Sequence, residues 1–290
     1  MDNLKAKQEL AFHAKTDCGK VRPHNEDNYL LEFWCPETST MLAVVADGMG
    51  GHRGGEIASK IAIDTFRELL ETPLPETHKE RYELLLGCFY KAHEAIQEAG
   101  CENIKLFGMG TTIVAAIISP TEYLHLYAGD CRLYHFTPGN NPYITADHSV
   151  VQVLLELGRI TEEEIPTHPM RSVVNSCLGG KENSQFSVDP KWDSEDLPVV
   201  RKWSAGDVLL LCSDGLNGEV SNQKLTNLVG EFGESPKKLT EECVNKALEH
   251  GGNDNITVIA IAVLAGVVKF FTPPQPSPYE GEGVRNSQMI

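Results

Sequence analysis

Acidic residues stand at five places where an apolar run meets a loop. Asp47 ends one such run and is followed by Gly-Met-Gly-Gly-His, Asp214 ends a second, and Asp254 stands just before a third. Carboxylates that end or open the strands of one sheet core can gather at one edge of it. At a separation of about 4 Å two like charges repel by about 4 kcal/mol at an effective dielectric of 20. Such a cluster must therefore be protonated, dispersed or neutralised by a metal ion.

The glycines after Asp47 let the backbone approach another group closely. One alternative is a phosphate held by backbone N–H groups, but the spacing matches neither the P-loop nor the dinucleotide fingerprint, and Asp47 would repel a bare phosphate. A divalent cation fits better, because carboxylate and carbonyl oxygens are the ligands that hard cations prefer. No His or Cys accompanies the acids at ligand spacing, which disfavours zinc and favours magnesium or manganese.

Two of the acidic segments also have simpler interpretations. Arg22-Pro-His-Asn-Glu26-Asp27 follows a predicted strand and, taken alone, indicates a solvated turn with an ion pair between Arg22 and Glu26. Gly129-Asp130 after an alternating strand is a typical hairpin signal. Only the recurrence of the pattern along the chain favours a shared site over separate turns.

The elements that must position these residues are mostly strands. Apolar runs bounded by turn residues predict strands at 10–14, 29–34, 41–46, 111–118, 123–128, 132–136, 208–212 and 256–263. Helical spacing predicts a consecutive helix pair across 57–70 and 82–96, a short helix from Ser221, and another from the N-cap Ser235 and Pro236 to Gly251. This order is not the alternation of a parallel sheet, so we expect antiparallel sheets covered by helices.

Two segments depart from this pattern. Residues 147–170 form a short polar excursion, with a helix at 150–157, a stop at Gly158 and a capping box of Thr161 and Glu164. Residues 271–290 are rich in Pro, Gly and Glu without periodicity, which predicts a flexible tail.

The composition is that of a folded domain, with 290 residues of which 41% are hydrophobic and 23% charged. The net charge of -16 argues against nonspecific binding to nucleic acid or to an anionic membrane. The longest apolar run, 258–268, is well short of the roughly 20 residues of a membrane helix. Eight cysteines without a C-x-x-C pair, and an N-terminus without a signal peptide, predict a cytoplasmic protein.

Six motifs in order carry a resemblance to a known family: R-x-x-N-E-D, D-G-M-G-G-H-x-x-G-E, G-x-G-T-T, G-D-x-R, S-D-G and N-D-N-x-T. They resemble those of the metal-dependent protein phosphatases of type 2C, and of the bacterial branch in particular, over residues 8–264. The resemblance implies one α+β domain, a four-layer α-β-β-α sandwich of two antiparallel sheets flanked by helix pairs. It also implies a binuclear Mn²⁺ or Mg²⁺ centre at one end and a small flap subdomain at about 147–170.

The resemblance further implies a set of metal ligands. Asp47 would bridge two ions, the Gly48 carbonyl would bind one of them, and Asp214 and Asp254 would hold the other. Asp130 with Asp214 resembles a weaker third-metal site. Asp47 and Asp214 are thereby candidate catalytic residues.

Other roles follow from the same resemblance. Glu26 would order water near the metal pair, with Asp27 supporting it. Arg22 would grip the substrate phosphate, since its planar fork of donors suits two phosphate oxygens. A hydroxide bridging the ions would attack phosphorus in line. We expect no phosphoenzyme, because no motif pairs a Cys or Ser with a base, and Ser213 is interpreted as a small residue fitting the strand end.

The chain departs from the family pattern at two positions. Met49 stands where eukaryotic members have a His proposed to protonate the leaving group, so the general acid is unassigned, and His52 is one candidate. Gly218 stands where many members have an acid. In the predicted flap, His148 and His168 are interpreted as structural.

The sequence thus predicts a phosphatase for phosphoserine and phosphothreonine in proteins, opposing a eukaryotic-like Ser/Thr kinase in a bacterial cytoplasm. We expect a monomer that acts on phosphorylated proteins and has no nucleic-acid or membrane partner. One alternative is a catalytically silent regulatory or scaffold domain of the same fold, which the complete set of acids disfavours. Another is a nucleotide-binding module using the glycines around Met49, which Asp47 and the missing Lys oppose.

Overall fold

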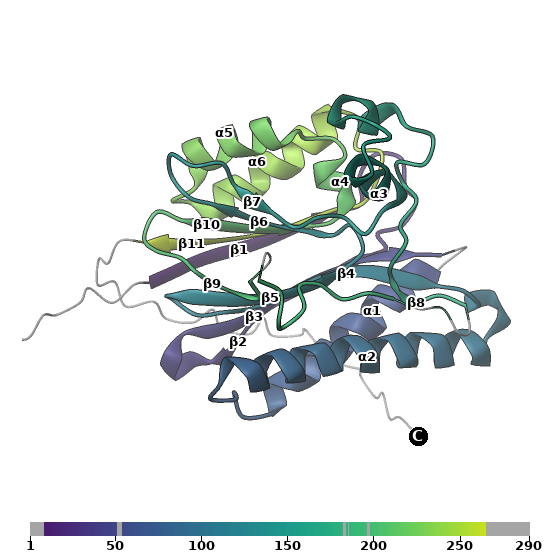
Figure 1. Cartoon of the computed structure of the whole chain (residues 1–290), viewed down its shortest axis with the longest axis horizontal. Helices are drawn as coiled ribbons and strands as arrows, with labels where there is room; N and C mark the ends of the chain where they lie inside the picture. The colour runs from purple at the N-terminus through teal and green to yellow at the C-terminus, as the bar shows by residue number, and fades with distance from the viewer. Residues whose placement is uncertain (1–8, 51–53, 182–183, 185, 196–197, 265–290) are drawn as a thin grey trace, which may run out of the picture.

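Two antiparallel sheets pack face to face and carry helices on their outer sides in the computed structural model (Figure 1). The structure describes residues 9–50, 54–181, 184, 186–195 and 198–264. His52 and the predicted tail, 271–290, lie outside the described residues. The sandwich confirms the expected α+β fold with antiparallel sheets and outer helix pairs.

Each sheet combines strands from distant parts of the chain. The first sheet has the order β1 (Glu9–Asp17), β11 (Ile256–Leu264), β10 (Val208–Cys212), β6 (Arg132–Phe136) and β7 (Tyr143–Ile144). The second has the order β2 (Asp27–Cys35), β3 (Thr40–Met49), β4 (Gly110–Ile118), β5 (Glu122–Ala128) and β9 (Val200–Lys202), and β8 (Leu178–Gly179) pairs with β4. In the first sheet Glu9 pairs with Leu264, so the first and last described strands are neighbours.

Helix pairs cover the two outer faces (Figure 1). The second sheet is covered by α1 (Gly54–Arg67) and α2 (His78–Glu102), and the first by α5 (Asn222–Phe232) and α6 (Pro236–Glu249). Two shorter helices, α3 (Val150–Glu156) and α4 (Asp214–Asn217), and 3-10 turns at Pro36–Thr38, Glu68–Glu71, Ile104–Leu106 and Glu162–Thr167 complete the structure. Within the described ranges, no helix is long and apolar enough to cross a membrane.

The layers are held by three apolar cores, one between the sheets and one under each helix pair. Strand β3 shows how one run of sequence serves two of them. Ala43 and Val45 face the other sheet, while Leu42 and Val44 face the helices. Because successive side chains of a strand point to opposite faces, a strand buried on both faces is a continuous apolar run.

All eight predicted strands are present, with ends extended by up to three residues. The helices α1, α2, α3, α5 and α6 also match, and the Thr161–Glu164 capping box forms. Ser221 caps α5 as predicted, whereas the Ser235 side chain makes no capping hydrogen bond to α6.

The hairpin interpretation of Gly129-Asp130 is wrong. Strand β5 belongs to the second sheet and β6 to the first, so the turn between them crosses the sandwich. Gly129 has φ +108, and an added Cβ would lie 2.3 Å from the Thr112 Cβ, so the crossing requires glycine. The turn therefore brings Asp130 to the seam between the sheets.

Candidate active site

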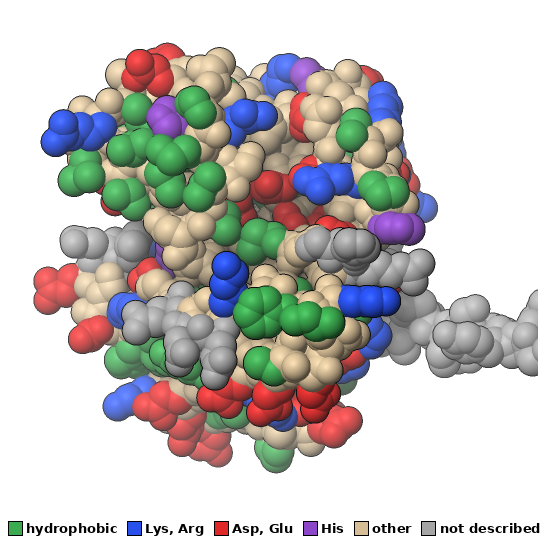
Figure 2. All heavy atoms as spheres, turned by 90° about the vertical axis from the view of Figure 1, so that its right-hand side faces the viewer, with side chains coloured by type: hydrophobic (Ala, Val, Ile, Leu, Met, Phe, Trp, Pro, Cys, Tyr) green, Lys and Arg blue, Asp and Glu red, His purple; other side chains and the backbone are tan. Residues whose placement is uncertain are grey.

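The predicted site residues gather at one end of the sandwich, where both sheets contribute to the seam. Asp27 opens β2 and pairs directly across the ladder with Asp47 near the end of β3. In the other sheet, Asp214 follows β10 as the first residue of α4, and Asp254 lies just before β11. The end shown in Figure 2 is hollowed, and acidic side chains line the hollow between the upper and lower halves.

A buried hydrogen bond joins the two sheets at this point. The Ser213 hydroxyl, which is fully buried, donates to Asp27 Oδ2 at 2.7 Å and accepts from the Thr257 N–H at 2.9 Å. Ser213 therefore does more than fill the strand end, since it orients the Asp27 carboxylate toward the seam. Its burial also removes it as a nucleophile, in agreement with the absence of a partnering base.

The carboxyl groups are close enough to perturb one another. Burial raises the pKa of Asp47 well above its usual value, and the charges of Asp27, Asp214, Asp130 and Asp254 raise it further. Burial likewise raises the pKa of Asp214 to about 6, with Asp254 adding to the effect and a hydrogen bond with Asp47 opposing it. Negative charge is costly here because burial and like charges both disfavour the ionised form.

Asp130 belongs to the same cluster. Burial raises its pKa to about 7, and the charge of Asp214 is the next cause. The carbonyl oxygen of Asp130 accepts from the Asn217 amide at 3.4 Å, which ties the crossing turn to α4. Gly218, where a family acid is expected, follows α4 and is exposed.

The donor set fits a hard divalent cation. Asp27 Oδ1 and Asp214 Oδ1 are buried oxygens without a hydrogen-bond partner among the described residues, and such atoms are costly unless a cation or donor reaches them. Among the described residues, no three His, Cys, Asp or Glu side chains already form a group that could hold one ion. An ion would therefore have to draw the carboxylates closer together.

The carboxylate of Asp254 forms an ion pair with the guanidinium of Arg22. The Arg22 Nη2 lies 2.7 Å from Asp254 Oδ2, with side chains 49% and 32% exposed. This ion pair corrects the sequence interpretation, which paired Arg22 with Glu26. The hydrogen bond to Asp254 raises the pKa of Arg22, whereas burial raises the pKa of Glu26 and the charge of Arg22 opposes it.

The Gly48 position has no room for a side chain. A Cβ there would lie 2.1 Å from the Gly55 carbonyl oxygen and 2.5 Å from that of Glu26. The Gly48 N–H donates to the same Glu26 oxygen at 3.2 Å. Two parts of the chain therefore pack against the glycine turn: the start of α1 and the loop before β2. Met49 is the last residue of β3 and lies next to this turn.

The base of the predicted flap is fixed next to Asp130. Arg132, whose side chain is 22% exposed, forms a two-pronged ion pair with Asp147, at 2.6 and 2.7 Å. His148 accepts from the Gly129 N–H at 3.2 Å through Nδ1 and contacts Asp189 at 2.9 Å through Nε2. These contacts agree with a structural role for His148. His168 similarly accepts from the Met170 N–H at 3.2 Å.

Two residues with extensive contacts received no role from the sequence. Arg132 belongs to the G-D-x-R motif and Asn255 to N-D-N-x-T, but only the acid of each motif was interpreted. Asn255 makes hydrogen bonds to the loop that carries Arg22. The signal in the sequence that could have indicated a role for both residues is their position inside the G-D-x-R and N-D-N-x-T motifs.

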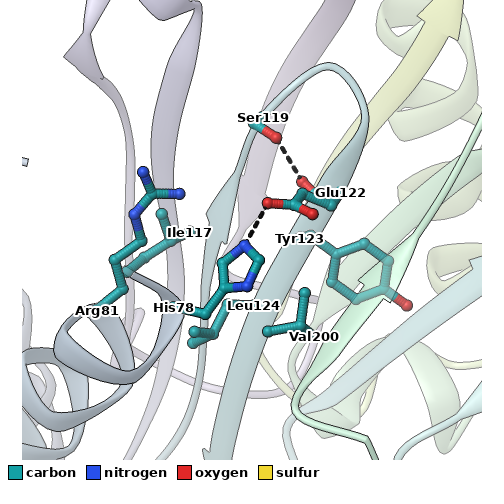
Figure 3. Close-up of a pocket in the computed structure, with 8 residues that line it drawn as sticks. All are labelled: His78, Arg81, Ile117, Ser119, Glu122, Tyr123, Leu124 and Val200. Carbon is teal, nitrogen blue, oxygen red and sulfur yellow. Dashed lines mark hydrogen bonds and ion pairs between the residues drawn. The ribbon is translucent and has the colours of Figure 1, made fainter. Parts of the chain in front are cut away.

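A small pocket elsewhere does not compete with this site. It lies between the start of α2 and the β4–β5 turn, where His78 Nε2 contacts Glu122 Oε1 at 2.5 Å (Figure 3). Its volume of about 10 Å³ has room for about one water molecule. A phosphorylated side chain does not fit there.

Known proteins match the chain over most of its length. A family model for protein phosphatase 2C matches residues 19–250. The serine/threonine phosphatase stp of Listeria welshimeri is 32% identical over 251 residues, which are 85% of this chain and 93% of that protein. The structure of the S. agalactiae serine/threonine phosphatase has a TM-score of 0.76 at 29% identity and covers 88% of this chain and 100% of that one. The catalytic domain of the phosphatase PstP in complex with two manganese ions has a TM-score of 0.72 at 29% identity, covering 88% and 98%.

Proposed function

Because this chain belongs to the protein phosphatase 2C family, and is thus a metal-dependent protein serine/threonine phosphatase, we propose that the carboxylates at the seam hold its Mn²⁺ or Mg²⁺ ions. Asp47, the Gly48 carbonyl, Asp214 and Asp254 would hold two ions, with Asp47 shared between them. Asp130 with Asp214 would supply a weaker third position. The observation that carries this assignment is the meeting of Asp27, Asp47 and Asp214 at the seam, where Asp27 Oδ1 and Asp214 Oδ1 are buried without a hydrogen-bond partner among the described residues.

When bound, divalent ions supply water with a lowered pKa and offset the negative charge of the phosphoryl oxygens. The residues of the chain orient this chemistry. Glu26 lies beside the cluster with a raised pKa, which suits a group that exchanges hydrogen bonds with water. Asp27, held by Ser213, supports Asp47 across the β2–β3 ladder.

Arg22 binds the substrate phosphate. Its side chain is half exposed, and its guanidinium already donates a hydrogen bond to one carboxylate, that of Asp254. A planar fork of N–H donors matches two phosphate oxygens, which a Lys ammonium does not. No role as general acid is assigned, since Met49 has no proton to donate and His52 lies outside the described residues.

The enzyme acts on phosphorylated proteins, and we propose that it opposes a bacterial Ser/Thr kinase. One domain, residues 8–264, carries the site, with a flap at about 147–170 beside it. A monomer suffices, because a single chain supplies every proposed ligand. A reducing, cytoplasmic setting is supported by eight cysteines that are all free of disulfides.

Hydrolysis of p-nitrophenyl phosphate and of a phosphothreonine peptide, with Mn²⁺ or with chelator, tests the proposal. Wild type should need metal, and Asp254→Asn should need more Mn²⁺ for half-maximal rate. Asp64→Asn, an exposed acid on α1 outside the site, is the matched control and should behave as wild type. Equal turnover with and without metal would rule out the assigned ligands. Absence of turnover in Mn²⁺-loaded wild type would favour the silent scaffold.

A further inference from the structure

The loop that carries Arg22 and Glu26 contains neither helix nor strand. Residues 18–26 run between β1 and β2, and therefore cross from the first sheet to the second. The side chains of Arg22 and Glu26 thus depend on contacts outside the loop for their position. The turn at 252–255, just before β11, supplies these contacts.

One buried amide makes most of them. Asn255 is 4% exposed, and its Nδ2 donates to the Cys18 and His24 carbonyl oxygens, each at 2.9 Å. Its Oδ1 accepts from the Glu26 N–H at 2.8 Å. A single side chain therefore holds the start, the middle and the end of the loop.

The residue type follows from these partners. Two donors and one acceptor on one short planar group are available only from an Asn amide, because an ionised Asp has no donor and Ser has one. Each backbone group left buried without a partner costs about 1–3 kcal/mol. Removing the amide therefore leaves the Cys18 and His24 carbonyl oxygens and the Glu26 N–H without this partner.

The same amide connects the loop to the proposed metal ligands. Asn255 directly follows Asp254, and its own N–H donates to Asp254 Oδ1 at 2.9 Å. Glu26, held by Asn255 through its N–H, accepts from the Gly48 N–H through its carbonyl oxygen at 3.2 Å. Asn255 thus links the Arg22 loop to Asp254 and, through Glu26, to the Gly48 turn.

We propose that Asn255 is the positioning residue that places Arg22 and Glu26 over the carboxylate cluster, without itself touching metal or substrate. The inference rests on the proposed role of Arg22 in binding phosphate. Backbone contacts help at one end of the loop, where the Lys20 N–H donates to the Gly252 oxygen at 2.8 Å. At the other end the Glu26 carbonyl oxygen accepts from the Ser59 hydroxyl at 2.6 Å, and the Asn255 amide is the group that joins both ends to His24 in the middle.

The first test is a double-mutant cycle on the Mn²⁺-loaded protein. Asn255→Ala should raise KM for the phosphothreonine peptide about tenfold and leave the Mn²⁺ concentration for half-maximal rate within about twofold. In an Arg22→Ala background the same change should raise KM less than about twofold, because the arginine that it positions is gone. An equal KM effect in both backgrounds, or a shift in the Mn²⁺ requirement instead of KM, overturns the proposal.

Thr240→Val is the matched control. Thr240 is fully buried, and its hydroxyl contacts His13 at 2.7 Å and the Lys237 carbonyl at 3.0 Å on α6, away from the loop. It should lower the thermal midpoint and leave KM unchanged. A rise in KM with Thr240→Val would show that general destabilisation explains the Asn255 effect.

Hydrogen exchange gives a readout that needs no activity. In metal-free wild type the Glu26 amide should be protected, and in Asn255→Ala it should exchange at least about tenfold faster, while the amides of residues 41–46 in the middle of β3 are unchanged. An unprotected Glu26 amide in wild type overturns the proposal even if the variant does not fold. If wild type is inactive but Glu26 is protected through Asn255, the proposed function fails and the anchoring of the loop stands.

Discussion

Arg22 and Asp254 form an ion pair of 2.7 Å at the rim of the carboxylate cluster, 232 positions apart in the chain. The guanidinium thereby neutralises part of the negative charge that a divalent ion would otherwise have to offset. Asp254 is a proposed metal ligand and Arg22 a proposed phosphate-binding residue, and the two share one contact. On this proposal, metal binding and the freedom of Arg22 to meet phosphate are coupled.

Arg22→Ala should weaken phosphate binding without weakening metal binding. A hydrogen bond to a charged group contributes about 1.5–3 kcal/mol, and about 1.4 kcal/mol is tenfold in affinity, so KM should rise about tenfold or more. The Mn²⁺ requirement should stay equal or fall, because Asp254 is released. Steady-state kinetics against Mn²⁺ and peptide measure both. Arg22→Lys should recover only part of the loss, and a raised Mn²⁺ requirement in Arg22→Ala would place Arg22 elsewhere in the mechanism.

Asp47→Asn should stabilise the metal-free protein and abolish stabilisation by Mn²⁺. The folded-state pKa of Asp47 is raised well above its usual value, so the folded state binds the proton more tightly and stability falls as the pH rises through that range. At pH 7.5 in chelator the variant should therefore melt several degrees above wild type. Wild type should gain about 2.7 kcal/mol at a Mn²⁺ concentration of about 100 Kd, and the variant should gain little.

Thermal unfolding with and without Mn²⁺ checks both halves of this prediction. Asp64→Asn removes an acid from the exposed face of α1 and should leave the melting temperature and its Mn²⁺ dependence as in wild type. A metal-free Asp47→Asn that melts below wild type would mean that the carboxylate is stabilised by partners instead of being repelled.

Two glycine substitutions should act in opposite directions. Gly48→Ala places a Cβ 2.1 Å from the Gly55 carbonyl oxygen, so the turn must shift, at a cost of about 1–3 kcal/mol and with loss of activity. Gly87→Ala, on the exposed face of α2, meets nothing within 4 Å and should stabilise the helix by about 1 kcal/mol. Urea unfolding and turnover of both variants decide the matter, and an active, stable Gly48→Ala would contradict the close packing.

His125 should contribute to destabilisation in acid. Burial lowers its pKa to about 3, with the charge of Arg201 as the next cause, so the unfolded chain takes up a proton below about pH 6.5 that the folded state refuses. Stability from this group is thus present above pH 6.5 and is lost as the pH falls, by up to about 1.4 kcal/mol per pH unit. The stability difference between wild type and His125→Gln should shrink from pH 6.5 to 4.5.

Urea unfolding in chelator at several pH values measures this difference. A constant gap between wild type and His125→Gln across the range would mean that the buried ring is already protonated.

The strands could be predicted from the sequence where burial on both faces requires a continuous apolar run. Leu42 to Val45 lie between two cores, so every side chain in the run is apolar, and the run is long enough to be unambiguous. Strands β7, β8 and β9 have only two or three residues, which is too short for any periodicity. Sheet membership is not local either. Nothing within Gly129-Asp130 distinguishes a hairpin from a crossing between sheets.

In the candidate site, too, the local features could be predicted from the sequence and the long-range contacts could not. The acids could be grouped from the sequence because each stands at the end of an apolar run. The partner of Arg22 could not be found in the same way, because Glu26 is its neighbour in sequence and Asp254 its neighbour in space. The role of Asn255 could not be predicted either, because an amide inside a turn has no sequence signature that identifies its three hydrogen-bond partners.

The pairing of Glu9 with Leu264 places both described ends of the chain at the same end of the sandwich. Strand β1 runs toward the Arg22 loop and β11 runs away from Asp254, so both described ends of the chain emerge side by side at the end of the sandwich opposite the carboxylates (Figure 1). Neighbouring strands are about 5 Å apart. A tether attached at either end would therefore hold the enzyme at the end of the sandwich opposite the carboxylates. The hollow with its acidic lining would remain open to a phosphorylated protein approaching from the other side.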